Sequence, residues 1–275
     1  MTVVVLALAS AALFGVMTVA LRVGLRGGEA RAATLATLLA ALAVSVVAFA
    51  VAGADVHGAW PFLLAGVLAP GGSQILFTLS IREAGASRTS VVVGTAPLVA
   101  VAIALVALDE PVRAPLVTGA FLIVGGGVVL ASERDRPEHL RALGLLYALG
   151  ATVLFAVRDN VVRALHGEAA PETAALATLV AGTLVALAWA RRVPTGGELR
   201  RLAPAGACFG LSYVCLFEAY ARGRVSVVSP LVATESLWGV ALAALVFRHT
   251  EGVGRKLTAG ALLVVAGGAL IGVSR

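Results

Sequence analysis

Leu154–Arg163 reads Leu-Phe-Ala-Val-Arg-Asp-Asn-Val-Val-Arg, and Leu13–Arg22 reads Leu-Phe-Gly-Val-Met-Thr-Val-Ala-Leu-Arg. The two stretches lie 141 residues apart, from 13 to 154, and share leucine, phenylalanine, valine and arginine at matching places. Both lie inside long apolar runs, but only the second carries charged side chains in its middle. The pair predicts a doubled chain whose second copy received charges that the first lacks.

The same offset recurs at separate places along the chain and drifts only around the third, fourth, eighth and ninth expected helices. It relates Leu35–Leu38 to Leu176–Leu179, and it relates several glycine and glutamate positions to their copies. Those further matches are Glu110 with Glu251, Gly119 with Gly260, and Gly126-Gly127 with Gly267-Gly268. A shared offset at so many places is hard to obtain by chance. We therefore expect two repeats of one unit, residues 1–132 and 142–275, joined by a polar linker at 133–141.

The composition indicates a membrane protein. Of the 275 residues, 60% are hydrophobic and 13% are charged, whereas soluble domains carry about 25% charged residues. About twenty apolar residues span a bilayer as a helix, and an open sheet edge cannot face lipid. We therefore expect an all-α, multi-pass protein of the cell (inner or plasma) membrane with ten transmembrane helices. The expected spans are 2–24, 32–52, 60–81, 88–108, 115–132, 142–165, 173–190, 202–221, 225–247 and 257–273. The N-terminus has no basic segment before its first apolar run, so this run is expected to stay as a helix rather than to be cleaved.

Five helices per repeat is an odd number, so the second repeat is expected to enter the membrane from the opposite side. Inverted repeats of this kind occur in secondary transporters, with the substrate site near the midplane between the halves. The charges of the connecting segments agree with inversion. The segment between the first and second expected helices carries Arg26 and Arg31, whereas its counterpart in the second repeat carries His166, Glu168 and Glu172. The segment between the second and third expected helices carries Asp55 and His57, whereas its counterpart carries Arg191, Arg192, Arg200 and Arg201. Basic residues favour the cytoplasmic side, which places both termini outside.

Other kinds of chemistry find little support. The net charge of +6 comes from residues scattered between apolar runs, so membrane lipid is the expected partner and nucleic acid is not. Cys208 and Cys215 lie two turns apart on one helix, too far to bridge, and are expected to be buried free thiols. Four scattered histidines give no metal-ligand spacing, and no metal, cofactor or catalytic residue is expected. The sequence does not indicate an oligomeric state.

Two short motifs accompany the repeats. Ala96-Pro97-Leu98 precedes Asp109-Glu110-Pro111 in the first repeat, and Glu235-Ser236 precedes Glu251 in the second. The whole chain resembles the EamA group of the drug/metabolite transporter superfamily, in which helices 4 and 9 carry a Pro or Glu-Pro, then an apolar run and a Gly-Glu-Arg-like turn. Two departures from that pattern stand out. Ser236 replaces the usual proline, and Asp109 and Thr250 replace the usual glycines.

The resemblance implies transport of a small metabolite, often export of an amino acid or a related solute, through a central cavity between the repeats. It also implies that both termini lie in the cytoplasm. This orientation is opposite to the one that the charges favour, so the sequence leaves the orientation open.

The charged stretch in the second repeat holds the first candidate site residues. Charges at the centre of a membrane helix cost about 2.5 to 3.5 kcal/mol each and tend to face cavities or partners. Arg158 and Asp159 are adjacent and are expected to point in different directions rather than to pair, whereas Asp159 and Arg163 can pair one turn apart. We expect Arg158, Asp159 and Asn160 to contact the solute. The alternative is that Arg163 snorkels to the interface and Asp159 neutralises it.

Two acidic residues are candidates for coupling transport to an ion gradient. Glu235 lies in an otherwise apolar helix without a nearby base, which fits a proton-linked or cation-contacting carboxylate, or a structural role in helix packing. Glu218 lies four residues from Arg222, so an ion pair at the interface is an equally good interpretation of Glu218.

Several polar and aromatic residues fit either cavity lining or packing. Tyr213 and Tyr220 share one helix face, Trp238 lies inside a helix, and Gln74 beside Ser73 is the matching polar spot of the first half. Pro97 and Pro230 are helix-break candidates that free backbone carbonyls. The resulting hypothesis is that a small polar metabolite binds between the halves. The residues expected to contact it are Arg158, Gln74, Tyr213 and Glu235.

Two other functions fit the composition. A membrane enzyme acting on a lipid would be expected to cluster His, Asp or Glu for metal or acid–base chemistry, and the sequence has no such motif. A pore or scaffold is the second alternative. Inverted halves with a charged midplane favour a gated carrier, but they do not exclude a slow pore. Saturable counterflow separates a carrier from a pore.

Overall fold

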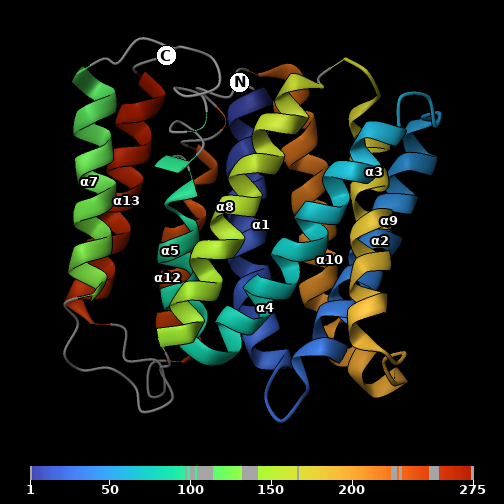
Figure 1. The fold of residues 1–275 in the computed structure, drawn as a ribbon, viewed down its shortest axis with the longest axis horizontal. Helices are drawn as coiled ribbons and strands as arrows, with labels where there is room; N and C mark the ends of the chain where they lie inside the picture. The colour runs from blue at the N-terminus through green and yellow to red at the C-terminus, as the bar shows by residue number, and fades with distance from the viewer. Residues whose placement is uncertain are drawn as a thin grey trace.

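The computed structural model describes residues 2–96, 98–99, 103, 114–131, 142–165, 167–223, 228, 231–247 and 254–273. Within these residues all regular structure is helical (Figure 1). Six helical segments of this part are long and apolar enough to cross a membrane. The chain is a multi-pass membrane protein, as its composition predicts.

The helices of the first half start and end close to the expected positions. They are α1 (Thr2–Gly24), α2 (Ala30–Ala52), α3 (Trp60–Gly66), the π-helical η1 (Val67–Gly72), α4 (Ser73–Ala84), α5 (Ala86–Val93) and α7 (Ala114–Ala131). The third expected span corresponds to α3, η1 and α4 together. The expected span 88–108 continues beyond α5 into positions that lie mostly outside the described residues.

The helices of the second half also follow the expected spans. They are α8 (Ala142–Ala164), α9 (Pro171–Ala190), α10 (Gly196–Arg222), α12 (Glu235–Val246) and α13 (Arg255–Val273). The span expected at 225–247 is helical from Glu235 onward, and the linker at 133–141 lies outside the described residues. The count of ten helices therefore stays a prediction.

The third span is not the continuous helix that its hydropathy predicts. Pro70 lacks the N–H that a helix interior needs, and its ring clashes with the preceding turn. Ala69 accordingly leaves helical geometry, with φ −145° and ψ 117°. After α4 the chain reverses at Gly85, whose φ of 87° favours glycine. The break and the reversal bring α4 and α5 to the middle of the molecule.

The two halves run through the molecule in opposite directions. In Figure 1, α1 starts at the upper edge beside the N-terminus, whereas its counterpart α8 starts at the lower edge and ends at the upper one. The last helix, α13, also ends at the upper edge. Opposite directions of the counterparts are what an inverted repeat requires. We call the upper edge the terminus edge.

The packing between helices is nearly unchanged when the two halves are exchanged. α1 packs against α10, and correspondingly α8 packs against α4. α2, α5 and α7 each pack against their own counterparts, α9, α12 and α13. Between α7 and α13, Gly126 lies against the Gly260 carbonyl oxygen, while the repeat-related Gly267 lies against that of Gly119. Small residues allow such close approach in lipid.

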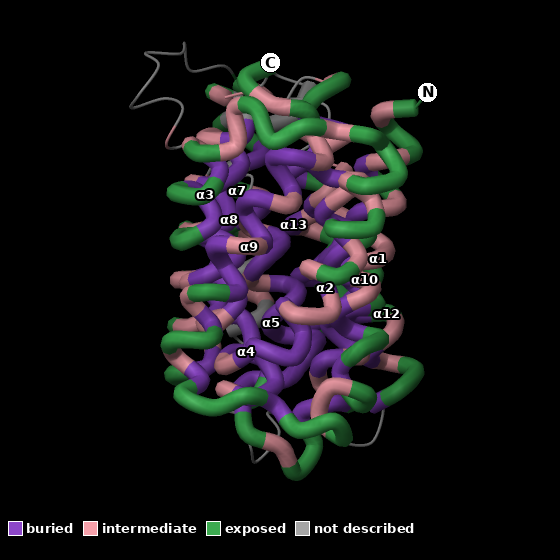
Figure 2. The backbone as a smooth tube through the Cα atoms, turned by 90° about the vertical axis from the view of Figure 1, so that its right-hand side faces the viewer, coloured by how far each residue is buried: buried purple, intermediate pink, exposed green. Residues whose placement is uncertain are grey.

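The buried residues lie along the central axis of the helix bundle. Figure 2 shows buried backbone through the centre of the molecule and exposed backbone on its outside and at both ends. Large apolar side chains are exposed on the outer surface, among them Phe121 and Leu245, as expected where a protein faces lipid rather than water.

The two basic connecting segments meet at the lower edge, which we call the arginine edge. A guanidinium nitrogen of Arg201 donates a hydrogen bond to the backbone carbonyl of Arg26 over 3.2 Å. Arg192 binds both carboxylate oxygens of Glu198 over 2.9 and 2.7 Å and lies 3.6 Å from Glu29. The segments after α1 and α9, which their charges predict to share one side of the membrane, lie together.

Candidate functional site

A cavity lies between the two halves, where α1, α5, α8, α10 and α12 converge. It encloses about 390 Å³ of space that atoms do not fill, including its open mouth. Its lining residues are Ser10, Phe14, Val93, Ala96, Phe155, Arg158, Asp159, Ser212, Tyr213, Leu216, Val232 and Glu235. We call it the central cavity.

The central cavity lies on the axis that relates the repeats, because repeat-related positions line it in pairs. Phe14 pairs with Phe155 at the offset of 141, and Ala96 pairs with Glu235 at an offset of 139. The charged members of the lining all come from the second half. The shape of the cavity thus follows from the doubled scaffold, and its charge comes from the divergence between the copies.

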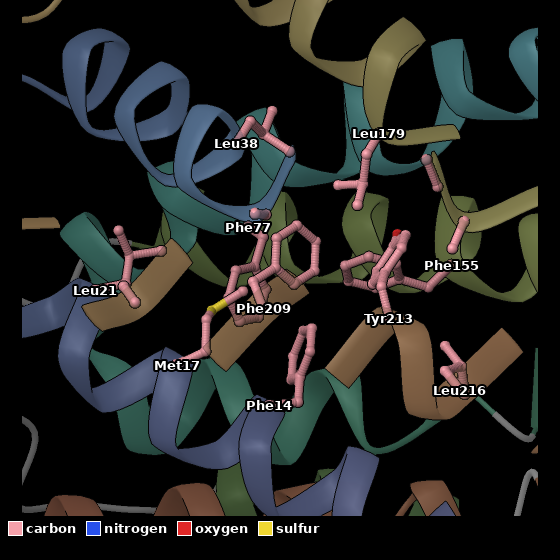
Figure 3. Close-up of a cluster of buried hydrophobic side chains, with 14 of the residues drawn as sticks. Phe14, Met17, Leu21, Leu38, Phe77, Phe155, Leu179, Phe209, Tyr213 and Leu216 are labelled. Atoms are coloured by element: carbon pink, nitrogen blue, oxygen red, sulfur yellow. The ribbon is translucent and has the colours of Figure 1, made fainter. Parts of the chain in front are cut away.

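Four phenylalanine rings pack together beside the central cavity (Figure 3), and two of them, Phe14 and Phe155, also line it. The Phe14 ring lies 5.2 Å from Phe77, 5.9 Å from Phe155 and 6.1 Å from Phe209, measured between centroids. Their tilted and edge-to-face angles are those that aromatic pairs prefer. Because α10 runs from the arginine edge to the terminus edge, Phe209 precedes the cavity residues Ser212 and Tyr213. This aromatic cluster therefore lies on the arginine-edge side of the cavity.

Arg158 is the centre of the polar lining. Its Nε and Nη2 donate to Asp159 Oδ1 over 3.0 and 2.8 Å, and its Nη1 donates to the Tyr213 hydroxyl over 2.5 Å. Its guanidinium also lies over the rings of Phe155 and Tyr213, 5.2 and 5.0 Å from their centroids. Only 6% of Arg158 is exposed. The cation is thus held by one carboxylate, one hydroxyl and two aromatic faces.

The expectation that Arg158 and Asp159 point apart is wrong. Their Cα–Cβ bonds do diverge around the helix, but the long arginine side chain folds back across its neighbour. Burial supplies the reason, since an unpaired charge away from water is far costlier than the bent rotamer. Arg158 therefore has a local partner, contrary to the sequence-based interpretation. The side chain of Arg163, the other expected partner of Asp159, lies outside the described part.

A pair of serines also lines the central cavity, and sequence reasoning missed it. Ser10 Oγ and Ser212 Oγ lie 3.0 Å apart, and each hydroxyl also reaches the other residue's backbone carbonyl oxygen over 3.0 Å. This reciprocal contact joins α1 of the first half to α10 of the second. Two serines 202 residues apart carry no sequence signal that would pair them.

Glu235 is the second acidic residue of the lining. It stands at the start of α12, is nine-tenths buried, and lies close enough to Arg158 and Asp159 to interact electrostatically with both. Within the described residues its carboxyl group forms no ion pair. Arg158, Asp159, Tyr213 and Glu235, four of the expected site residues, therefore meet in one cavity.

Comparison with known proteins decides the family. Residues 1–132 and 142–273 match the model of the EamA-like transporter family. The chain belongs to this family. The resemblance inferred from the sequence motifs is confirmed, and this EamA-like protein is a membrane transporter of the drug/metabolite type rather than a member of an enzyme family.

Solved structures agree on the fold of this EamA-like transporter. A crystal structure of a protein 20% identical in sequence covers 98% of this chain, and the match takes in 95% of that chain, with a TM-score of 0.72. At this identity the likeness concerns the fold alone. No relative is found among curated proteins.

Five of the described residues that were expected at the site of this EamA-like transporter lie outside the lining of the central cavity, and three of these are Asn160, Trp238 and Gln74. Asn160 donates from Nδ2 to the Ala156 carbonyl of its own helix over 2.8 Å. Trp238 is 45% exposed on α12. Gln74 is fully buried in α4 without a hydrogen-bond partner for its amide among the described residues.

The remaining expected residues have other surroundings. Glu218 forms an ion pair with Arg222 near the end of α10, which is the interfacial arrangement named as its alternative. Tyr220 lies nearer the terminus edge, in the wall of a second cavity. Pro97 and Pro230 lie outside the described residues. Cys208 and Cys215 are free and partly buried, and no group of metal-ligating side chains occurs in the part of the chain that the structure describes.

Proposed function

We propose that this protein is a secondary transporter of a small polar metabolite, an amino acid or a related solute, which it exports across the cell membrane by alternating access. The solute binds in the central cavity between the inverted repeats. The observation that carries this proposal is a buried arginine that faces a cavity on the axis between the halves. Charges placed at such depth are costly and mark solute pathways.

The chemistry of the lining supports a solute with groups of both signs. The guanidinium has five N–H donors in a planar fork, and Arg158 uses three of them on Asp159 and Tyr213. The remaining donors are available to a carboxylate of the solute. Glu235 supplies a carboxylate that is not engaged in an ion pair among the described residues and can accept from a solute ammonium group. A zwitterion satisfies both groups at once.

Alternating access follows from the inverted architecture. In transporters of this construction, one repeat rocks against the other around a fixed midplane site. Here Ser10, on α1, and Ser212, on α10, join the halves beside the solute. Their contact can break and re-form when the halves move, while Arg158, Asp159 and Tyr213 stay together within the second half.

Counterflow in proteoliposomes tests the proposal. Vesicles are loaded with a panel of unlabelled amino acids and related metabolites, and entry of the labelled solute is followed. We expect saturable counterflow for at least one solute, reduced strongly by Arg158→Lys because an ammonium cannot reproduce the fork. Arg200→Lys, an exposed change on the same protein, serves as the matched control. Entry that neither saturates nor depends on internal solute would identify a pore instead.

Glu235 is proposed as the coupling carboxylate. It is the cavity carboxylate without an ion pair in the described part, so it is the group best placed to exchange a proton during the cycle. We expect Glu235→Gln to abolish stimulation of transport by a pH gradient while Glu172→Gln, at the start of α9, leaves the stimulation intact. Transport that is indifferent to a pH gradient in the parent protein would remove this role.

A further inference from the structure

A second cavity lies between the central cavity and the terminus edge. It encloses about 270 Å³, including its mouth, and its walls include Val162, Leu165, Ala169, Phe217 and Tyr220. These residues come from the last turns of α8 and α10 and from the connection between α8 and α9. In Figure 1, the ends of α8 and α10 and the start of α9 all lie at the terminus edge. We call this cavity the vestibule.

The vestibule continues the central cavity along the same two helices. On α8, the central-cavity residue Asp159 is followed one turn later by the vestibule residue Val162. On α10, Tyr213 is followed one turn later by Phe217. A helical turn rises about 5.4 Å, so the partition between the two cavities is one layer of side chains thick.

Two contacts make up this partition. The Tyr213 and Phe217 rings lie 5.6 Å apart at an angle of 33°. Beside them, Tyr220 lies close enough to Asp159 to interact with it electrostatically. Tyr213 is fixed by its hydrogen bond to Arg158, whereas the Tyr220 hydroxyl has Asp159 nearby but makes no hydrogen bond of normal geometry with it.

Tyr220 is the unusual member of the partition. The residue is 1% exposed, and its hydroxyl makes no hydrogen bond of normal geometry with any described residue. Buried hydroxyls nearly always have a partner, because an unsatisfied one loses its hydration without return. A hydroxyl in the wall of one cavity, close to the Asp159 carboxylate that lines the other, fits a side chain that meets a polar solute as it passes.

We propose that Tyr220 is the gate between the central cavity and the vestibule, and that the solute enters or leaves at the terminus edge by this path. The Tyr220 ring closes the path, and its rotation joins the two cavities. The larger aromatic cluster around Phe14 and Phe209 lies on the opposite side. This inference rests on the proposed transport function, which says that a solute passes through the gate. The gate itself is tested without any solute.

The test measures thiol accessibility in a variant whose native cysteines are replaced by serine (Cys208→Ser, Cys215→Ser). Ser212→Cys reports on the central cavity, and Ala169→Cys reports on the vestibule. A membrane-impermeant maleimide is added to sealed vesicles of both orientations. Labelling of Ala169→Cys identifies the vesicles whose terminus edge faces the reagent. Labelling of Ser212→Cys is then compared in those vesicles with and without Tyr220→Ala.

We expect Tyr220→Ala to speed labelling of Ser212→Cys from the terminus edge by about tenfold, equivalent to about 1.4 kcal/mol in the opening equilibrium. Labelling of Ala169→Cys should not change. Tyr147→Ala, which alters the tyrosine of α8 outside both cavities, should leave Ser212→Cys labelled at the slow rate. Tyr220→Leu is the second variant if Tyr220→Ala does not fold.

Unchanged labelling of Ser212→Cys in both Tyr220 variants, or faster labelling only from the arginine edge, would overturn the gate. A failure of the transport proposal would appear differently, as absence of counterflow in a protein whose labelling still responds to Tyr220.

Discussion

Replacing Arg158 by methionine removes the cation that neutralises Asp159 inside the bundle. The two side chains are 6% and 12% exposed, and two guanidinium nitrogens contact a single carboxylate oxygen over 3.0 and 2.8 Å. Removing one partner of a buried ion pair costs about 3–5 kcal/mol, because the other charge is left without compensation. We expect Arg158→Met and Asp159→Asn each to lower the free energy of unfolding by about 3 kcal/mol or more.

The double variant Arg158→Met/Asp159→Asn distinguishes the effect of the charges on stability from the effect of side-chain packing. With both charges removed and most of the volume kept, a buried pair is often replaced at little net cost. The Arg158→Met/Asp159→Asn protein should therefore be more stable than either single variant, with a coupling energy of about 2 kcal/mol or more. Reversible unfolding by SDS in mixed micelles, followed by tryptophan fluorescence, measures all four proteins.

The exposed pair at the arginine edge is the matched control. Arg192 and Glu198 also form two close contacts, but water screens them, so Arg192→Met and Glu198→Gln should behave almost independently. The reasoning fails if the changes at 158 and 159 are additive within about 0.5 kcal/mol, because the buried pair would then carry no special interaction.

Three further outcomes are expected. Gly126→Ala should lower the melting temperature, because its new methyl would lie 2.7 Å from the Gly260 carbonyl oxygen. Gly125→Ala places its methyl in open space and should leave the melting temperature unchanged. Equal melting temperatures of the two variants would contradict this packing. Tyr213→Phe should lower both the melting temperature and, by about tenfold or more, kcat/KM for the solute, since it removes a buried hydrogen bond to a charged group worth about 1.5–3 kcal/mol. Normal kinetics would show that this bond does not position Arg158. Thr195→Ala should cost about 1 kcal/mol in SDS unfolding by removing the N-cap of α10, and an unchanged unfolding curve would show that this cap adds nothing.

Much of the fold is readable from the sequence because apolar runs and a repeated offset both report on it directly. Gly119 and Gly260 recur at the same offset as Gly126 and Gly267, and the structure places Gly126 against Gly260 and Gly267 against Gly119. The break at Pro70 is less visible, because the leucine and alanine residues around it keep the run apolar whether or not the helix is continuous.

The site is only partly readable, because sequence shows which residues are unusual but not what they touch. Arg158 stands out as a charge in an apolar run, and the structure places it in the central cavity. Its pairing with Asp159 depends on a bent side chain that backbone periodicity does not reveal. Ser10 and Ser212 carry no signal, since a serine in a membrane helix more often bonds to its own backbone.

The orientation of Trp238 also escapes sequence reasoning. Its helix, α12, is apolar all round, so periodicity cannot tell a cavity face from a lipid face. The structure exposes Trp238 on the outer surface and turns Glu235, three residues earlier, into the cavity.

Solute counterflow by the Arg158→Met/Asp159→Asn protein tests the central claim most directly. This variant is expected to fold, so a loss of transport reports on the site rather than on stability. We predict saturable counterflow in the parent and in Arg200→Lys, and none above protein-free vesicles in the double variant. Counterflow at the parental rate in the double variant would contradict the assignment of the central cavity as the solute site.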